Sequence, residues 1–287
     1  MKKISLKTIL ALIKFRVSIA VTFTAITTYI VYAETVDYKI LWVVLGVFLL
    51  ASGASALNEY QEHKYDALMK RTQSRPIPSG DLTPLQGFII SWLFIIGGAA
   101  VLYFAFNTVT ALLGLFNILW YNGIYTSLKR ITAFAVVPGS LVGAIPAFIG
   151  WTAAGGYVFD STIVFISFYL FIWQVPHFWL LMLKYGSEYE QAGFPTINNA
   201  VKPQSLNKII FTWVLGTAFS SIIIPLFLVN ISLPFFLLVF VLNLSFIFLF
   251  VKLAFGKEQT INFRKSFIGI NVYMMVFMIM LIAFHLI

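Results

Sequence analysis

Apolar residues run through the chain in long stretches that short polar segments interrupt. The stretches lie near residues 17–33, 38–57, 88–106, 108–125, 134–151, 161–181, 209–230, 233–251 and 267–286. About 17 to 25 apolar residues in a helix are enough to cross the hydrocarbon core of a bilayer. None of the stretches shows the period-two alternation of a membrane barrel strand. The pattern therefore predicts an all-α membrane protein of about nine transmembrane helices, forming one integral-membrane domain over residues 1–287.

The positive charges test this division of the chain. Of the 19 lysines and arginines, only Lys39 falls on the other side of the membrane from the rest. Because cytoplasmic loops carry an excess of Lys and Arg, we expect a plasma or inner membrane location, a cytoplasmic amino terminus and an outer carboxyl terminus. A cleaved signal peptide ending at Val31-Tyr32-Ala33 is the alternative for the first stretch. It would leave the remaining charge alternation unexplained.

Composition narrows the classes of function. Hydrophobic residues make up 60% of the chain, charged residues only 10%, and cysteine is absent, so any metal must use oxygen or imidazole ligands. The net charge of +9 lies in short loops, as topology signals do, which argues against nucleic-acid binding. No carboxylate falls in the middle of an apolar stretch, which argues against an ion-coupled transporter. Chemistry is expected at the inner membrane face.

The strongest local pattern follows the second apolar stretch. Asn58, Glu62 and Asp66 are spaced i, i+4 and i+8, so they share one helix face. Carboxylate and amide oxygens suit Mg²⁺, which completes its shell with water and substrate phosphates. The cations that follow could neutralise diphosphate oxygens: Lys70, Arg71 and Arg75. The alternative is an ordinary charged helix end that fixes topology.

Two other inner loops repeat this chemistry. The loop after the sixth stretch carries Glu188 and Glu190, and the loop after the fourth carries Lys129 and Arg130. Acidic loops in both halves of the chain would let two metal ions hold one diphosphate. For the cationic loop, simple positive-inside signalling is the alternative.

A polar patch lies near the end of the sixth stretch, in the segment from Trp173 and Gln174 to His177. An imidazole inside the membrane is a functional candidate by default, as an iron ligand or a base. The alternative is a histidine that orients neighbouring helices through a hydrogen bond.

These residues resemble the intramembrane prenyltransferases of the UbiA superfamily, and within it the branch that prenylates haem. The resemblance spans nearly the whole chain. Its most specific marks are the block from Asn58 to Pro76, the segment from Tyr125 to Thr132, the segment from Gly143 to Trp151 and the segment from Trp173 to Phe178.

The resemblance implies a UbiA-type bundle around a central cavity and transfer of a farnesyl group from farnesyl diphosphate to a vinyl group of haem B, giving haem O and diphosphate. A downstream haem A synthase would be a partner, beside the lipid bilayer. By the same resemblance, Mg²⁺ would bind Asn58, Glu62, Asp66 and Glu188, and the first three would be catalytic together with Lys129. The substrate-binding residues would be Lys70, Arg71, Arg75, Arg130, Trp173, Gln174 and His177.

Some positions depart from the family pattern. The family has aspartate at Glu62 and Glu188, arginine at His63, an acid at Lys64 and methionine at Thr196. These changes leave open a prenyltransferase acting on a quinone precursor or another aromatic ring. A transporter would move substrate without releasing diphosphate, and a structural assembly factor would tolerate loss of Asp66.

Overall fold

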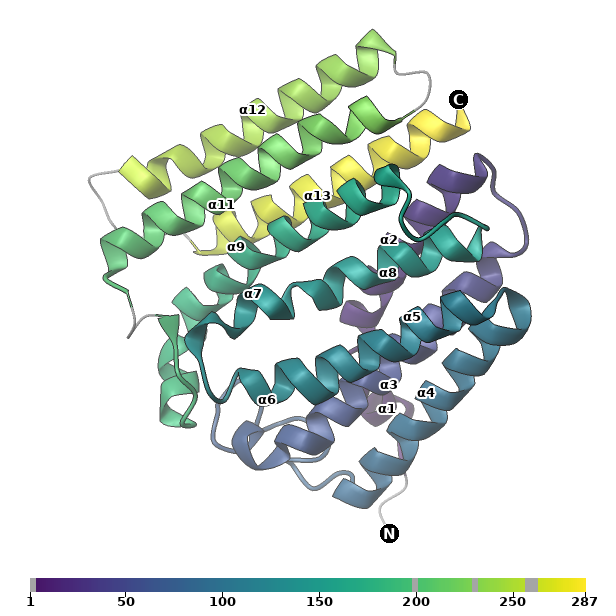
Figure 1. The fold of residues 1–287 in the computed structure, drawn as a ribbon. Helices are drawn as coiled ribbons and strands as arrows, with labels where there is room; N and C mark the ends of the chain where they lie inside the picture. The colour runs from purple at the N-terminus through teal and green to yellow at the C-terminus, as the bar shows by residue number, and fades with distance from the viewer. Residues whose placement is uncertain (1–3, 198–200, 229–231, 256–262) are drawn as a thin grey trace.

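The computed structural model describes residues 4–197, 201–228, 232–255 and 263–287, and every regular element within them is a helix (Figure 1). Eight of the described helical segments are long and apolar enough to cross a membrane. They are α2 (Phe15–Ala33), α3 (Ile40–Asp66), α4 (Pro84–Ala105), Ala133–Ala153, α9 (Ser161–Gln191), Ser205–Phe227, Leu233–Val251 and α13 (Phe263–Leu286). The protein is therefore a multi-pass helical membrane protein.

The fourth predicted span, 108–125, is not among these eight and is assembled from shorter pieces. It comprises α5 (Thr108–Ile118), the π-helix η1 (Leu119–Tyr125) and the single turn α6 (Thr126–Leu128), which follow one another without a break. The span Ala133–Ala153 likewise joins η2 (Ala133–Ala135), α7 (Val136–Gly139) and α8 (Leu141–Ala153). The prediction of about nine spans thus agrees with the structure, while the predicted end at residue 230 lies outside the described residues.

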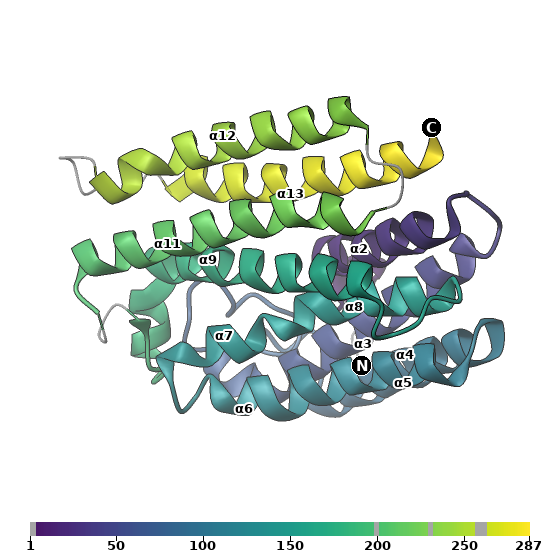
Figure 2. The same ribbon diagram turned by 45° about the horizontal axis from the view of Figure 1, so that its top comes forward.

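The helices form two groups with three helices between them. α11 (Pro203–Ile223), α12 (Leu233–Phe255) and α13 lie on one side, and α3, α4 and α5 lie on the other (Figures 1 and 2). α2, α8 and α9 run between the groups, and short helices α1 (Leu6–Leu12) and η3 (Ile224–Phe227) complete the fold. One apolar core surrounds Tyr169 and Phe277, and a second surrounds Leu50 and Leu102.

Small residues bring neighbouring helices close together. A Cβ atom on Gly98 of α4 would lie 2.8 Å from the Gly46 carbonyl oxygen of α3, and one on Gly150 of α8 would lie 1.9 Å from the Ala25 carbonyl oxygen of α2. Beside the second contact, the Thr28 hydroxyl donates to the Ala147 carbonyl oxygen at 2.7 Å. Such close approach is typical of helix packing in membranes. These contacts hold α3 against α4 and α2 against α8.

Polar residues at the helix ends follow capping chemistry. Asn107, in the two-residue break between α4 and α5, accepts a hydrogen bond from the Thr110 backbone N–H at 2.9 Å. Thr83 and Gln86 form a capping box at the start of α4, and Asp160 caps α9. The predicted stretches 88–106 and 108–125 are therefore separate helices, with the break at Phe106 and Asn107.

One expected inner loop is largely helical. α9 continues to Gln191, so Glu188 and Glu190 lie on a helix rather than in the loop that the sequence analysis predicted. The polar segment 184–191 contains no proline, and the first residue after it with a positive φ is Gly193, at +84°. α3 continues past its apolar part to Asp66, as the predicted helix face of Asn58, Glu62 and Asp66 requires. Both long helices thus carry polar side chains out of the apolar layer at the same end of the bundle.

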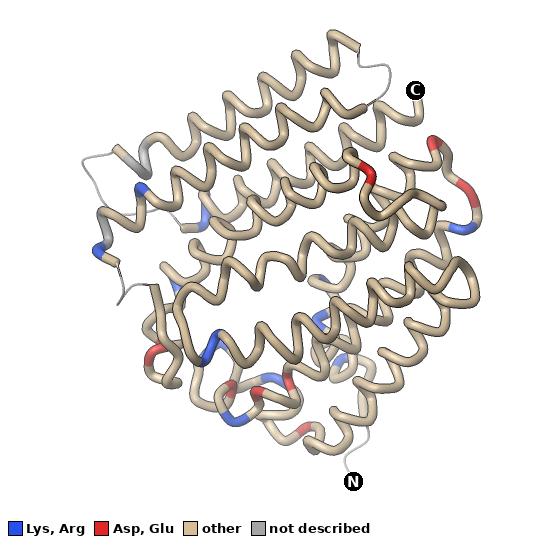
Figure 3. Tube along the Cα trace, in the orientation of Figure 1, with Lys and Arg blue, Asp and Glu red and all other residues tan. Residues whose placement is uncertain are grey.

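Charged residues separate along the bundle axis. Figure 3 places most of the lysines and arginines at the end where α3 and α9 finish, with a few charges at the opposite end. That opposite end carries Glu34, Asp37, Lys39 and Asp160. The site described next lies at the basic end.

Candidate active site

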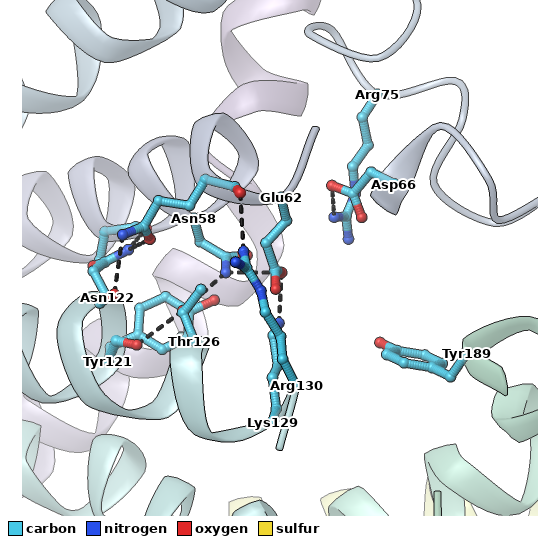
Figure 4. Close-up of polar contacts among 12 residues, drawn as sticks. Asn58, Glu62, Asp66, Arg75, Tyr121, Asn122, Thr126, Lys129, Arg130 and Tyr189 are labelled. Atoms are coloured by element: carbon cyan, nitrogen blue, oxygen red, sulfur yellow. Dashed lines mark hydrogen bonds and ion pairs between the residues drawn. The ribbon is translucent and has the colours of Figure 1, made fainter. Parts of the chain in front are cut away.

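The three oxygen-bearing residues of α3 line one cavity. Asn58, Glu62 and Asp66 are buried, with exposed fractions of 2%, 4% and 2%, and each contributes to the wall of a cavity of about 210 Å³ at the basic end of the bundle (Figure 4). We call this space the mouth cavity. The spacing that predicted a shared helix face is therefore matched by a shared cavity.

A lysine from a distant part of the chain contacts one of these three α3 side chains. Lys129, just after α6, forms a short ion pair with Glu62 Oε2. The Asn58 side-chain amide donates to the same carboxylate at 3.0 Å and to the Thr126 hydroxyl at 3.2 Å. Lys129 thus brings positive charge into the mouth cavity beside the carboxylates (Figure 4).

A second lysine, from the amino-terminal segment, contacts another of the three α3 side chains. Lys14, whose φ of +48° turns the chain between α1 and α2, donates to Asn58 Oδ1 at 2.9 Å. Burial away from water, together with the positive charges of Arg75 and Lys129, lowers the pKa of the Lys14 ammonium to about 7. A polyanion in the mouth cavity would favour its charged form.

The segment after α3 folds back over the cavity. Arg75 forms an ion pair with Asp66 Oδ2 at 2.7 Å. Although burial opposes its charge, the Asp66 carboxylate raises the pKa of the Arg75 guanidinium above its ordinary value. Arg71 lies across from α9, where it donates to the Tyr189 hydroxyl at 2.8 Å. The cavity thus has cations on several sides.

The donor set fits a hard divalent cation. Glu62 Oε1 is buried and has no hydrogen-bond partner in the described part of the chain, so its lone pairs are free for a cation. Among the described residues, no three side chains of His, Cys, Asp or Glu stand close enough together to bind a metal alone. Mg²⁺ does not require such a cage, because it keeps waters and substrate phosphates as ligands. Asn58, Glu62 and Asp66 suit that kind of open site.

The π-helix η1 supplies the aromatic wall of the mouth cavity. Tyr121 and Tyr125 stack with ring centroids 5.9 Å apart, and both line the cavity. η1 is fastened to α3 by Asn122, whose amide donates to the Ala54 carbonyl oxygen and to Gln61 Oε1, each at 3.1 Å. π-helices often mark functional sites. Here the element holds two tyrosine rings beside the carboxylates.

A second cavity of about 200 Å³ lies deeper in the bundle. We call it the inner chamber. Its wall is mainly apolar, and its residues come from α2, α3, α5, α8 and α9, including Val47, Leu50, Ala51, Ala54, Pro146 and Ile149. Tyr121 and Phe178 line both the mouth cavity and the inner chamber. A charged compartment and an apolar compartment therefore adjoin at these two residues.

Other predicted cations and acids lie outside the cavity walls. Glu188 Oε2 accepts a hydrogen bond from the Arg71 backbone N–H at 3.0 Å, which ties α9 to the segment after α3. Arg130 turns away, donating to the Gln61 carbonyl oxygen at 3.0 Å and covering the Tyr65 ring. Lys70 is exposed. Of these three, none lines the mouth cavity, and their roles in binding remain predictions.

The polar patch on α9 divides between two faces. Gln174 lines the inner chamber, whereas Trp173 donates from its indole N–H to the Ile270 carbonyl oxygen of α13 at 2.8 Å. The His177 ring packs against Trp173 and Phe267, with centroids 5.0 and 4.9 Å away, and its Nδ1 is buried. His177 thus faces α13 rather than the described cavities, and its contact with haem stays a prediction.

Sequence reasoning did not select Lys14 or Tyr121 for the site. Lys14 carried only a topology signal, because its contact with Asn58 depends on the turn between α1 and α2. Tyr121 is one of many aromatic residues in the sequence, and no motif predicts the π-helix that carries it.

The sequence is similar to those of known prenyltransferases. Residues 18–281 match the model of the UbiA prenyltransferase family. A protoheme IX farnesyltransferase from Geobacter sulfurreducens is 40% identical over 188 residues, which cover 65% of this chain and 69% of that protein. Another protoheme IX farnesyltransferase, from Bdellovibrio bacteriovorus, is 34% identical over 245 residues, which cover 85% of this chain and 83% of that protein.

Solved structures share the fold. The structure of a digeranylgeranylglyceryl phosphate synthase superposes with a TM-score of 0.79 at 18% identity, covering 98% of each chain. A UbiA homologue from Archaeoglobus fulgidus, bound to GPP and Mg²⁺, gives a TM-score of 0.69 at 12% identity, covering 96% of this chain and 98% of that one.

Proposed function

Since the chain belongs to the UbiA prenyltransferase family, we propose that its two adjoining cavities transfer a farnesyl group from farnesyl diphosphate to a vinyl group of haem B, giving haem O and diphosphate. The observation that carries this proposal is the meeting of a cationic mouth cavity with an apolar chamber at Tyr121 and Phe178. The names of the relatives from Geobacter and Bdellovibrio support haem as the acceptor. Haem O would then serve a downstream haem A synthase.

The donor fits the two cavities in one orientation. Its diphosphate is an anion and belongs with Lys14, Arg71, Arg75 and Lys129 in the mouth cavity, while its hydrocarbon tail belongs in the inner chamber. The bond between C1 and the diphosphate oxygen then lies beside Tyr121 and Phe178. Asn58, Glu62 and Asp66 would hold Mg²⁺, which neutralises charge on the departing diphosphate. The UbiA homologue from Archaeoglobus fulgidus is bound to GPP and Mg²⁺, which supports a prenyl diphosphate and Mg²⁺ as the ligands here.

Breaking that bond gives diphosphate both bonding electrons and leaves an allylic cation. Cations around the diphosphate stabilise the growing negative charge. The faces of Tyr121 and Phe178 would stabilise the allylic cation. The vinyl group of haem B then supplies its π electrons to C1, and the new cation on the haem side takes up water and loses a proton, giving the hydroxyl group of haem O.

Replacing Tyr121 tests the aromatic part of this mechanism. We expect Tyr121→Leu to lower the farnesyl-transfer rate by about tenfold or more, because a cation–π interaction in a desolvated site contributes about 2 kcal/mol. Tyr121→Phe keeps the ring and should retain most of the activity. Single-turnover rates of both variants, measured at saturating donor, distinguish the ring from the hydroxyl group. Equal loss in both variants would contradict a role for the ring face.

The inner chamber predicts a preference for prenyl length. Ala54 of α3 lines the chamber, so Ala54→Phe should shorten the space for the tail. We expect the ratio of kcat/KM for farnesyl diphosphate over geranyl diphosphate to fall by about tenfold, the scale on which apolar pockets discriminate by size. Ala99→Phe, a substitution on α4 away from both cavity walls, is the matched control. An unchanged ratio in Ala54→Phe would argue that the tail lies elsewhere.

Acceptor competition tests the function as a whole. Purified protein in lipid nanodiscs is incubated with radiolabelled farnesyl diphosphate and Mg²⁺, with either protohaem or an aromatic acid as acceptor. We expect label in haem O and release of diphosphate. Label in the aromatic acid but not in haem would assign the chain to a quinone-type branch. Uptake of labelled substrate into proteoliposomes without diphosphate release would indicate a transporter.

The charge pattern supports a plasma or inner membrane location with the mouth cavity facing the cytoplasm. In that orientation, diphosphate would leave directly into the compartment where farnesyl diphosphate is made available.

A further inference from the structure

Three polar side chains interrupt the apolar wall of the inner chamber. Ser55 of α3, Asn117 of α5 and Gln174 of α9 all line it, although they come from separate helices. Asn117 Oδ1 is buried without a hydrogen-bond partner in the described part of the chain. Neither the Ser55 hydroxyl nor the Gln174 amide makes a hydrogen bond to the described residues. Unpaired polar groups inside a membrane bundle are costly, so they point to a ligand that supplies the missing bonds.

In one other part of the bundle, a cluster of buried polar side chains satisfies itself. Between α11, α12 and α13, the Tyr273 hydroxyl lies 2.9 Å from both Ser221 Oγ and Asn243 Oδ1, and the Asn243 amide donates to Ser221 at 2.9 Å. That cluster needs no ligand. The chamber residues differ because they face a space rather than each other.

The backbone makes room for Gln174 in particular. A Cβ atom on Gly143 of α8 would lie 1.7 Å from Gln174 Oε1, so any side chain at Gly143 would displace the amide. Gln174 also precedes Phe178 by four residues, which places it about 6 Å along the same helix from the ring at the cavity junction. The amide therefore stands one helical turn inside the chamber from the position of the reacting carbon.

We propose that Ser55, Asn117 and Gln174 hold the water molecule that becomes the hydroxyl group of the product; this inference rests on the proposed function. A buried water needs two to four polar partners and a polar, roomy site, and these side chains can supply three. Water donates its hydrogens to amide or hydroxyl oxygens and keeps a lone pair for bonding to carbon.

The reaction balances with this water as the only added reactant. After C1 of the farnesyl group bonds to the terminal vinyl carbon, the positive charge lies on the vinyl carbon next to the porphyrin ring. A lone pair of the held water forms the carbon–oxygen bond, and the oxonium proton passes to the released diphosphate. Without a held water, the same cation loses a proton from the neighbouring carbon instead and gives a conjugated alkene, lighter by one water.

Product partition tests this proposal. The protein and its Gln174→Leu variant are incubated in nanodiscs with protohaem, farnesyl diphosphate and Mg²⁺, and mass spectrometry compares hydroxylated with dehydrated haem product. We expect the dehydrated-to-hydroxylated ratio to rise by about tenfold or more in Gln174→Leu, the factor that loss of one hydrogen bond sets. Val142→Leu, which narrows the same chamber without removing a polar group, should leave the ratio unchanged.

The outcomes separate this inference from the proposed function. Absence of any farnesylated haem from the unmodified protein would overturn the proposed function. Haem O from Gln174→Leu at an unchanged product ratio, even at a lower rate, would overturn the water site alone. If Gln174→Leu does not fold, Ser55→Ala and a high-resolution structure of the unmodified protein decide. A shifted product ratio, or an ordered water within hydrogen-bond distance of Gln174 and Asn117, supports the site; an unchanged ratio and a bare chamber wall overturn it.

Discussion

Replacing Asp66 by asparagine is expected to lower the rate of farnesyl transfer by about a thousandfold, the scale of losing one electrostatic element of a transition-state site. Asp66 lies in the mouth cavity and forms an ion pair with Arg75 at 2.7 Å. Asparagine keeps the shape but removes the charge that holds both a divalent cation and the Arg75 guanidinium. Because the diphosphate gains charge only as the bond breaks, the loss should appear in kcat more than in KM.

Asp160→Asn is the matched control for this substitution. Asp160 caps α9 at the opposite end of the bundle, and asparagine caps helices equally well. Single-turnover release of labelled diphosphate, with thermal unfolding as a check on folding, measures both variants. Full activity in Asp66→Asn, or equal loss in both variants, would contradict a catalytic role for this carboxylate.

Lys129 gives the second large effect, because its ammonium shares Glu62 with the proposed Mg²⁺ site. We expect Lys129→Met to lower kcat/KM for farnesyl diphosphate by about a hundredfold, because the mouth cavity loses a desolvated charge that faces the diphosphate. The neighbouring Arg130 provides a sharp comparison. It points to the Gln61 carbonyl oxygen outside the cavity wall, so Arg130→Met should change kcat/KM by only a few-fold.

Steady-state kinetics over a range of donor concentrations compares the Lys129→Met and Arg130→Met variants. Loss of activity in Arg130→Met to the same degree as in Lys129→Met would mean that the loop binds the diphosphate as a whole, as the sequence analysis expected. A selective loss in Lys129→Met would assign the binding to the cavity-lining side chain.

Periodicity within one helix was the most informative feature of the sequence. Asn58, Glu62 and Asp66 could be placed on one face because they lie on a single helix, and helical geometry fixes their relation. The spans were predictable for a similar reason, since lipid demands long apolar helices. Contacts between distant segments were not predictable in this way, because no local rule brings Lys14 onto Asn58 or Lys129 onto Glu62.

The segment from Trp173 to His177 illustrates the limit of motif reasoning. Neighbouring residues on a helix point about 100° apart, so a motif read as one unit can serve two faces. Gln174 lines the inner chamber, whereas Trp173 and His177 pack toward α13. The loop predicted at Glu188 failed for another reason: polar composition ended the apolar span, but it did not end the helix.

The central claim is that the donor lies across the junction of the two cavities. The most direct measurement is the structure of the protein with Mg²⁺ and a non-ionising thiodiphosphate analogue of farnesyl diphosphate. We predict the thiodiphosphate among Asn58, Asp66, Arg75 and Lys129, C1 between Tyr121 and Phe178, and the tail in the inner chamber. A tail lying outside the chamber, or a diphosphate group away from the α3 carboxylates, would contradict the account.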